Sequence, residues 1–144
     1  MKNKLFLLAG CIAVMIAAFA FVGCEKKNSS NALVGTWVCS EYSEYYGWET
    51  QTIVFKKNGK GTMTYEDGDG DRSNYDLKYT FNDDTDRGTI TLTYTDLEYH
   101  ETYSYTMDFK VYWHDKNTVT FYVRDYDYYY YYDEWEEMGV FRRQ

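Results

Sequence analysis

Apolar and polar residues alternate one by one along most of this chain, and this spacing limits its fold more than any other feature. The clearest runs read Tyr75-x-Leu77-x-Tyr79-x-Phe81, Ile90-x-Leu92-x-Tyr94 and Tyr103-x-Tyr105-x-Met107-x-Phe109-x-Val111-x-Trp113. A period of two gives a β-strand one apolar and one polar face, whereas a helix repeats about every 3.6 residues. The spacing therefore predicts an all-β domain. Strands are expected near residues 34–42, 49–56, 60–66, 74–82, 88–95, 102–113, 117–124 and 135–143.

Short turn-forming segments separate these strands. Asn58-Gly59 accommodates a positive φ at both central positions of a tight hairpin, and residues 82–88 and 114–117 are also typical of turns. Eight antiparallel strands in a meander lose their free edges when they close into a barrel. The sequence therefore predicts an eight-stranded antiparallel up-and-down β-barrel. The alternative is a two-sheet sandwich with Greek-key crossings, which requires a long connection that the sequence lacks.

Alternation by itself does not separate a soluble barrel from an outer-membrane barrel, because both have one apolar face. Half of the predicted strands are shorter than the roughly 9–11 residues that cross a bilayer. Asp and Lys also accompany Thr on the polar faces. These features favour the soluble form, with the membrane barrel as the alternative.

The first 23 residues have the pattern of an export signal. Lys2 and Lys4 precede 19 uncharged apolar or small residues, from Leu5 to Gly23. The end of this segment, Phe21-Val22-Gly23-Cys24, resembles the lipobox of bacterial lipoproteins, although that motif usually has Leu in place of Phe21. The resemblance implies cleavage before Cys24 and lipidation of Cys24, for example with palmitate. An uncleaved transmembrane anchor is the alternative, because 19 apolar residues just span a bilayer.

This interpretation divides the chain into a signal peptide (1–23), a lipidated Cys with a polar tether (24–32) and a barrel domain (33–144). The mature chain has 23 acids and 13 bases, a net charge of −10, and lacks the basic stripe that nucleic-acid binding requires. Cys39 has no partner for an intramolecular disulfide and is expected to be a buried thiol. We expect an outer-membrane lipoprotein, on the periplasmic side rather than the cell surface, because Glu25-Lys26-Lys27 lacks an acidic run typical of surface export.

Three short motifs resemble those of lipocalins. Leu33-Val34-Gly35-Thr36-Trp37 is similar to their Gly-x-Trp opening, and residues 55–62 (FKKNGKGT) are similar to the first hairpin of small lipocalin-like lipoproteins of Gram-negative bacteria. Val140-Phe141-Arg142-Arg143 resembles their closing strand. The resemblance implies that Gly35 and Trp37 belong to the closed end of the barrel, where Arg142 or Arg143 stacks on the indole. It also implies that ligands enter at the opposite, open end.

The loops can be sorted by end, because alternate connections of an up-and-down barrel lie at opposite ends. Residues 41–49, 66–74, 96–101 and 124–137 share the open end and carry −3, −3, −3 and −5, or −14 in all, whereas the other connections carry +1. Carboxylates beside aromatic rings favour a cationic or amphipathic partner. Alternatively, the acids only keep the protein soluble. The candidate ligand-binding residues are Tyr46, Trp48, Tyr99, Tyr126, Tyr128, Tyr130 and Trp135.

Other chemistry has little support in the sequence. Asp67, Asp69 and Asp71 have the spacing of a calcium loop, but Arg72 and Lys78 stand where an EF-hand requires Gly and Glu, so no metal site is predicted. His100 and His114 fall at opposite ends of the predicted barrel. No Ser or Cys nucleophile has a candidate base nearby in the sequence, and there is no Gly-rich phosphate loop. Neither an enzyme nor a bound cofactor is expected.

Three functional hypotheses follow. The favoured one is a lipid-anchored envelope protein that binds a small amphipathic or cationic ligand at the acidic, aromatic open end. The second is a docking module for a basic protein, for example an inhibitor of a lysozyme-like enzyme. The third is a structural envelope lipoprotein without a ligand, for which a filled barrel interior is expected.

Overall fold

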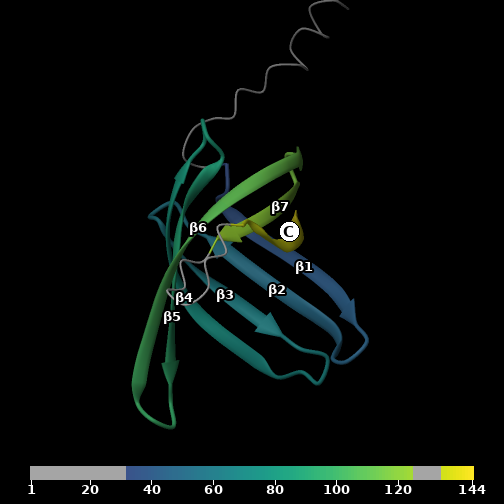
Figure 1. The fold of residues 1–144 in the computed structure, drawn as a ribbon, viewed down its shortest axis with the longest axis vertical. Coiled ribbons are helices and arrows are strands. Elements are labelled where there is room, and N and C mark those ends of the chain that lie inside the picture. Colours follow the sequence, from purple (N-terminus) through teal and green to yellow (C-terminus); the bar gives the residue numbers. More distant parts are fainter. Residues whose placement is uncertain (1–31, 125–133) are drawn as a thin grey trace, which may run out of the picture.

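The computed structural model describes residues 32–124 and 134–144. Its strands are β1 (Gly35–Ser43), β2 (Gly47–Phe55), β3 (Lys60–Glu66), β4 (Arg72–Asn82), β5 (Arg87–Asp96), β6 (Glu101–Asp115), β7 (Thr118–Arg124) and β8 (Glu136–Arg143). Each strand is antiparallel to the next, and β1 also pairs with β8, so the sheet closes in sequence order (Figure 1). The predicted up-and-down barrel is confirmed. Within the described ranges, no helix has the length and apolar character needed to cross a membrane.

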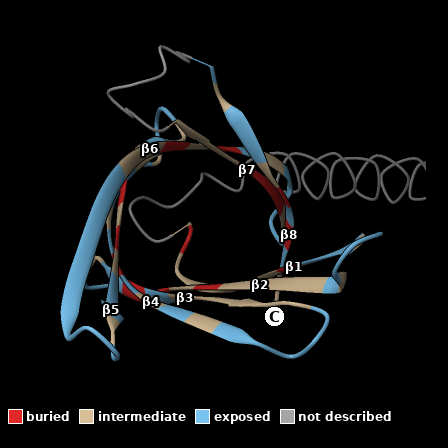
Figure 2. Cartoon of the chain, turned by 60° about the horizontal axis from the view of Figure 1, so that its bottom comes forward, coloured by how far each residue is buried: buried red, intermediate tan, exposed pale blue. Residues whose placement is uncertain are grey.

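Aromatic and aliphatic side chains that point inward fill one end of the barrel. Phe55 stacks on Phe121 with the ring centroids 5.9 Å apart, and Phe121 meets Phe141 edge to face at 5.0 Å. In Figure 2 the buried stretches occur in strands all around the wall, while a long part of β6 is exposed. The buried core consists of Leu33, Trp37, Cys39, Ile53, Phe55, Leu77, Ile90, Leu92, Phe109, Val111, Val119, Phe121 and Phe141.

The wall is continuous at this filled end but divides at the other. Among the described residues, β1 and β8 form two residue pairs, at Trp37 and Val38 of β1. The β4–β5 ladder stops at Asp76 and Thr93, although β4 continues beside β3 and β5 beside β6. Strands β1–β4 and β5–β8 therefore separate as two sheets. We call this divided end, with the connections at 44–46, 67–71 and 97–100, the mouth, and the filled end the closed end.

Trp37 lies across the closed end and is completely buried. Its Nε1 donates a hydrogen bond to the Leu33 carbonyl at 2.8 Å. The Arg143 guanidinium lies 4.5 Å from the indole centroid and donates hydrogen bonds to the carbonyls of Val34, at 2.9 Å, and Ala32, at 2.7 Å. Arg142 is exposed on the other face of β8. Of the two arginines that the lipocalin resemblance suggested, Arg143 is therefore the one that stacks on Trp37.

Gly35 supports this arrangement at the start of β1. Its φ is +141°, a value that side-chain-bearing residues rarely adopt, and an added Cβ would lie 3.3 Å from Arg143 Nη1. A glycine at this position therefore leaves room for the guanidinium beside the backbone.

Candidate ligand site at the barrel mouth

The predicted mouth residues that the structure describes do not converge on one cavity. Tyr46 and Tyr99 lie in different hairpin turns and are 62% and 68% exposed. Trp48 lies on the outer face of β2, since Ile53 on the same strand faces inward, and its ring meets Tyr42 edge to face at 5.8 Å. Tyr126, Tyr128 and Tyr130 fall outside the described residues.

Trp135 lies over a group of cations on the outer face of the barrel. The indole centroid is 5.7 Å from the Arg87 guanidinium, 4.5 Å from Lys110 Nζ and 4.9 Å from the Arg124 guanidinium. Lys110 points outward because the adjacent Phe109 is buried inside. Each contact is a cation–π interaction, which fixes the indole against β5, β6 and β7.

A different set of side chains faces the interior in the mouth half of the barrel. These residues alternate with outward-facing neighbours and share their strand faces with the buried core. They are mainly tyrosines, methionines and carboxylates, a set suited to an amphipathic molecule. We call them the lumen lining: Glu41, Glu49, Gln51, Met63, Tyr65, Tyr75, Tyr94, Tyr105, Met107 and Val123.

Two carboxylates share one wall of this lining. Glu41 of β1 and Glu49 of β2 are direct partners in the antiparallel ladder, and like charges in such a pair destabilise a sheet. Glu41 accepts a weak hydrogen bond from the Cys39 thiol at 3.7 Å, and Glu49 accepts one from the Tyr65 hydroxyl. Every Lys and Arg on the described strands points outward except Arg143, which is at the closed end. No described cation therefore neutralises this wall from inside.

Two groups beside the wall have raised pKa values. The hydrogen bond to Glu49, together with desolvation, raises the pKa of Tyr65 to about 12. Burial, with a further contribution from the Glu41 charge, raises the pKa of Cys39 to about 11. The Gln51 amide oxygen is buried without a hydrogen-bond partner among the described atoms. This wall therefore offers acceptors to a positively charged donor.

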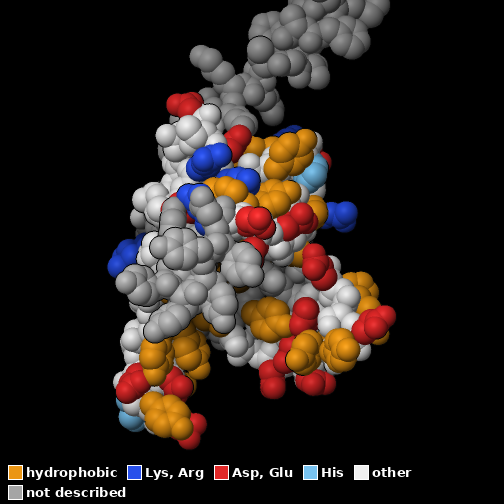
Figure 3. Space-filling model, in the orientation of Figure 1, with side chains coloured by type: hydrophobic (Ala, Val, Ile, Leu, Met, Phe, Trp, Pro, Cys, Tyr) orange, Lys and Arg blue, Asp and Glu red, His pale blue; other side chains and the backbone are white. Residues whose placement is uncertain are grey.

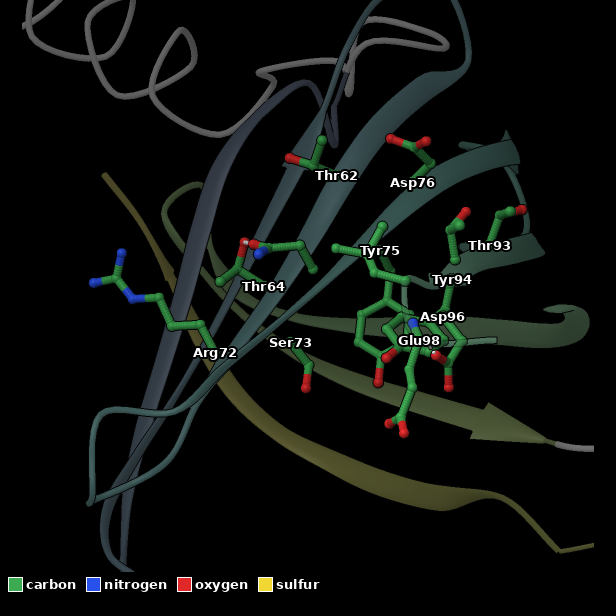
Figure 4. A pocket seen from close by; sticks show the side chains of 13 residues that line it. Thr62, Thr64, Arg72, Ser73, Tyr75, Asp76, Thr93, Tyr94, Asp96 and Glu98 are labelled. Carbon is green, nitrogen blue, oxygen red and sulfur yellow. Dashed lines mark hydrogen bonds between the residues drawn. The ribbon is translucent and has the colours of Figure 1, made fainter. Parts of the chain in front are cut away.

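A groove of about 770 Å³ opens beside the mouth, where β4 and β5 separate (Figure 4). Tyr75 and Tyr94 meet at its inner side, with their ring centroids 5.8 Å apart. Polar side chains make up most of the remaining surface. The complete lining is Thr62, Thr64, Arg72, Ser73, Asn74, Tyr75, Asp76, Thr93, Tyr94, Thr95, Asp96, Leu97 and Glu98.

A smaller opening of about 400 Å³ follows the seam between β1 and β8. Here the two strands approach closely without pairing, because β8 has Gly139 at the contact. A Cβ added to this glycine would lie 2.8 Å from Cys39 Sγ and 2.9 Å from Glu41 Oε1. Side chains of β1 therefore fill the space beside Gly139, and the opening lies along the rest of the seam.

The acidic turn between β3 and β4 is held by its own backbone. Asp67 accepts the N–H groups of Asp69 and Asp71, at 3.0 and 2.9 Å. These contacts are typical of an aspartate that stabilises a turn. Across the described parts of the chain, no group of three or more His, Cys, Asp or Glu side chains is arranged to hold a metal ion.

The fold and the mouth define a closed eight-stranded antiparallel barrel with a tyrosine-rich, acidic opening, which is compatible with a lipocalin-like fold. Comparison with protein-family models, with curated proteins and with solved structures finds no significant match.

Proposed function

We propose that this protein is a lipid-anchored envelope protein that binds a small amphipathic cation in the mouth half of its lumen. The observation that carries this proposal is the pair of inward carboxylates, Glu41 and Glu49, with no described Lys or Arg beside them. A protonated amine would lie against this pair, of which Glu49 is half-buried and Glu41 is exposed, because two adjacent carboxylates attract positive charge. Tyrosine rings and methionine side chains would contact the apolar part of the ligand.

Isothermal titration calorimetry with three ligands of equal chain length tests the proposal. We expect saturable binding of decyltrimethylammonium, and no binding of decanoate or decyl glucoside. The double variant Glu41→Gln and Glu49→Gln should weaken binding by about tenfold or more, a change of about 1.4 kcal/mol. Glutamine still accepts the Tyr65 hydrogen bond, so the change mainly removes charge.

The matched control removes two charges from exposed rim positions, Glu44→Gln and Glu98→Gln. It should leave the affinity within about twofold, because exposed charges act weakly across solvent. Equal binding of all three ligands, or an equal loss in the control, would contradict the proposal. Failure of every ligand to bind would favour the structural role without a ligand.

A second candidate, docking of a basic protein, is favoured by the side chains at the hairpin tips. Tyr45 is 92% exposed and Leu97 is 81% exposed. On the face shown in Figure 3, hydrophobic and acidic side chains gather at two projections of the mouth. Exposed aromatic side chains offer rigid contact area, and the acids favour a positively charged partner. Capture of a lysozyme-like protein should weaken as salt is raised, and binding that is indifferent to salt would contradict this candidate.

A further inference from the structure

We infer that the gap between β4 and β5 is a slot that accepts an extended basic peptide segment as an additional strand. This inference rests on the second candidate function, because it specifies how a segment of a docked basic protein would be held. It does not depend on a ligand in the lumen.

The slot is bordered by two strand edges that pair with no other described strand across the gap. Beyond Asp76 and Thr93, β4 continues to Arg72 in the ladder with β3, and β5 continues to Asp96 in the ladder with β6. Each strand is therefore held in extended form on its far side. On the near side its N–H and C=O groups have no strand partner among residues 32–124 and 134–144. Such edges are templates for an incoming strand, whose backbone would form hydrogen bonds with the edges of β4 and β5 at the same time.

The gap is an open groove on the outer side of the wall, and the contact between the Tyr75 and Tyr94 rings bounds it on the inner side. Its volume is about 770 Å³, and it continues from the barrel wall to the rim at Leu97. In the other place where neighbouring strands part, the β1–β8 seam, a Cβ at Gly139 would already be 2.8 Å from Cys39 Sγ. The β4–β5 gap is therefore the better position for an inserted backbone.

The charge and shape of the slot select the kind of segment. Three carboxylates line it, those of Asp76, Asp96 and Glu98, whereas its one guanidinium, on Arg72, lies 2.5 Å from Glu66. An inserted strand would direct alternate side chains inward toward the Tyr75 and Tyr94 rings and outward past Asp76. The slot therefore fits a segment in which lysines alternate with apolar or β-branched residues.

Fluorescence anisotropy with a labelled peptide tests this inference on the full-length protein. The probe is a seven-residue acetylated peptide amide of alternating Lys and Val, and the control is the same sequence with N-methylated Val amides. N-methylation keeps the charge but removes every second hydrogen-bond donor. We expect the control to bind about tenfold more weakly or worse. Equal affinity of the two peptides would overturn the inference that the peptide binds as an additional strand, because charge alone would then explain binding.

Two further measurements locate the peptide. Amide hydrogen exchange should slow at residues 73–75 and 94–96 when the peptide binds, and unchanged exchange there would overturn the inference. Asp76→Asn should weaken binding by about two- to fivefold, whereas the matched change Asp84→Asn at the closed end should have no effect. If a basic protein binds the rim but the peptide does not bind, the slot is contradicted while the second candidate stands. If neither binds, both are contradicted.

Discussion

Arg143 joins the last strand to the first at a place where the ladder between them is short. Its guanidinium stacks on Trp37 and donates to the carbonyls of Val34 and Ala32. We expect Arg143→Met to lower the free energy of unfolding by about 2–3 kcal/mol, because the stacking and two charged hydrogen bonds are lost. Urea denaturation measures this change.

Arg142→Met is the matched control on the exposed face of β8. It should change the stability by less than about 0.5 kcal/mol, as exposed substitutions usually do. Equal losses in the two variants would show that net charge, rather than the contact with Trp37, stabilises the closed end.

Cys39 provides a test of the acidic wall through its pKa. Burial and the Glu41 charge raise the pKa of this thiol from 9.0 to about 11, so the folded state disfavours the thiolate. The resulting stabilisation is complete below pH 9 and is lost as the pH rises toward 11. In a Cys11→Ser, Cys24→Ser variant at pH 8, iodoacetamide should alkylate folded Cys39 about 100-fold more slowly than the urea-unfolded chain.

A further Glu41→Gln change should lower the pKa of Cys39 and accelerate this alkylation. Alkylation of the folded protein at the rate of the unfolded chain would contradict the buried position of the thiol. An unchanged rate in the Glu41→Gln variant would show that burial alone sets the pKa.

Single residues also mark the limit of prediction from sequence. Period-two spacing places Glu41 on the same face as Trp37 and Cys39. Glu41 was nevertheless counted among the charges of the connection 41–49, because carboxylates on inward faces are uncommon in proteins. The position of Trp135 could not be predicted from the sequence for another reason. Its cation–π partners come from three strands, and such distant contacts leave no local pattern.

At the scale of strands, Gly139 allows β8 to approach β1. Its φ is +130°, and an added Cβ would meet both Cys39 Sγ and Glu41 Oε1 within 3 Å. Gly139→Ala should therefore lower the free energy of unfolding by about 2–4 kcal/mol, through backbone strain and overpacking together. Thermal denaturation measures the loss.

Gly70→Ala separates these two causes. Gly70 also has a positive φ, +88°, but no atom of the described residues lies within 4 Å of an added Cβ. This variant should lose only the backbone contribution, about 1–2 kcal/mol. Adding Cys39→Ala to Gly139→Ala should recover part of the packing loss, and the absence of any recovery would show that Cys39 is not the limiting contact.

The eight strands were predicted within a few residues because turn chemistry and alternation are local signals. Asn58-Gly59, for example, lies in the β2–β3 hairpin as expected, although Gly59, at +75°, has a positive φ and Asn58 does not. The end of each ladder was not predictable in this way. Alternation shows which face a residue occupies, but barrel twist and coiling decide how far two strands stay paired. The β4–β5 slot therefore became visible only in the structure.

At the scale of the whole molecule, the mouth and the start of the domain lie at opposite ends. Ala32 accepts a hydrogen bond from Arg143 at the closed end, eight residues after Cys24 in the sequence. If Cys24 is lipidated as proposed, the mouth faces away from the bilayer. Metabolic labelling with a palmitate analogue should be abolished by Cys24→Ser and retained in Cys11→Ser. Labelling that persists in Cys24→Ser would contradict the anchor.

The two sheets that separate at the mouth share one packed core at the closed end, so they are joined at one end only. A strand inserted between β4 and β5 would fix the separation of the two sheets at the mouth. A change in that separation would also change the distance between the Glu41–Glu49 wall and the tyrosines on β5 and β6. Occupancy of the slot and of the lumen would then be linked, and each occupant would change the affinity for the other by the same factor. A basic partner bound in the slot would in this way raise or lower the affinity of the lumen for its ligand without contacting the ligand.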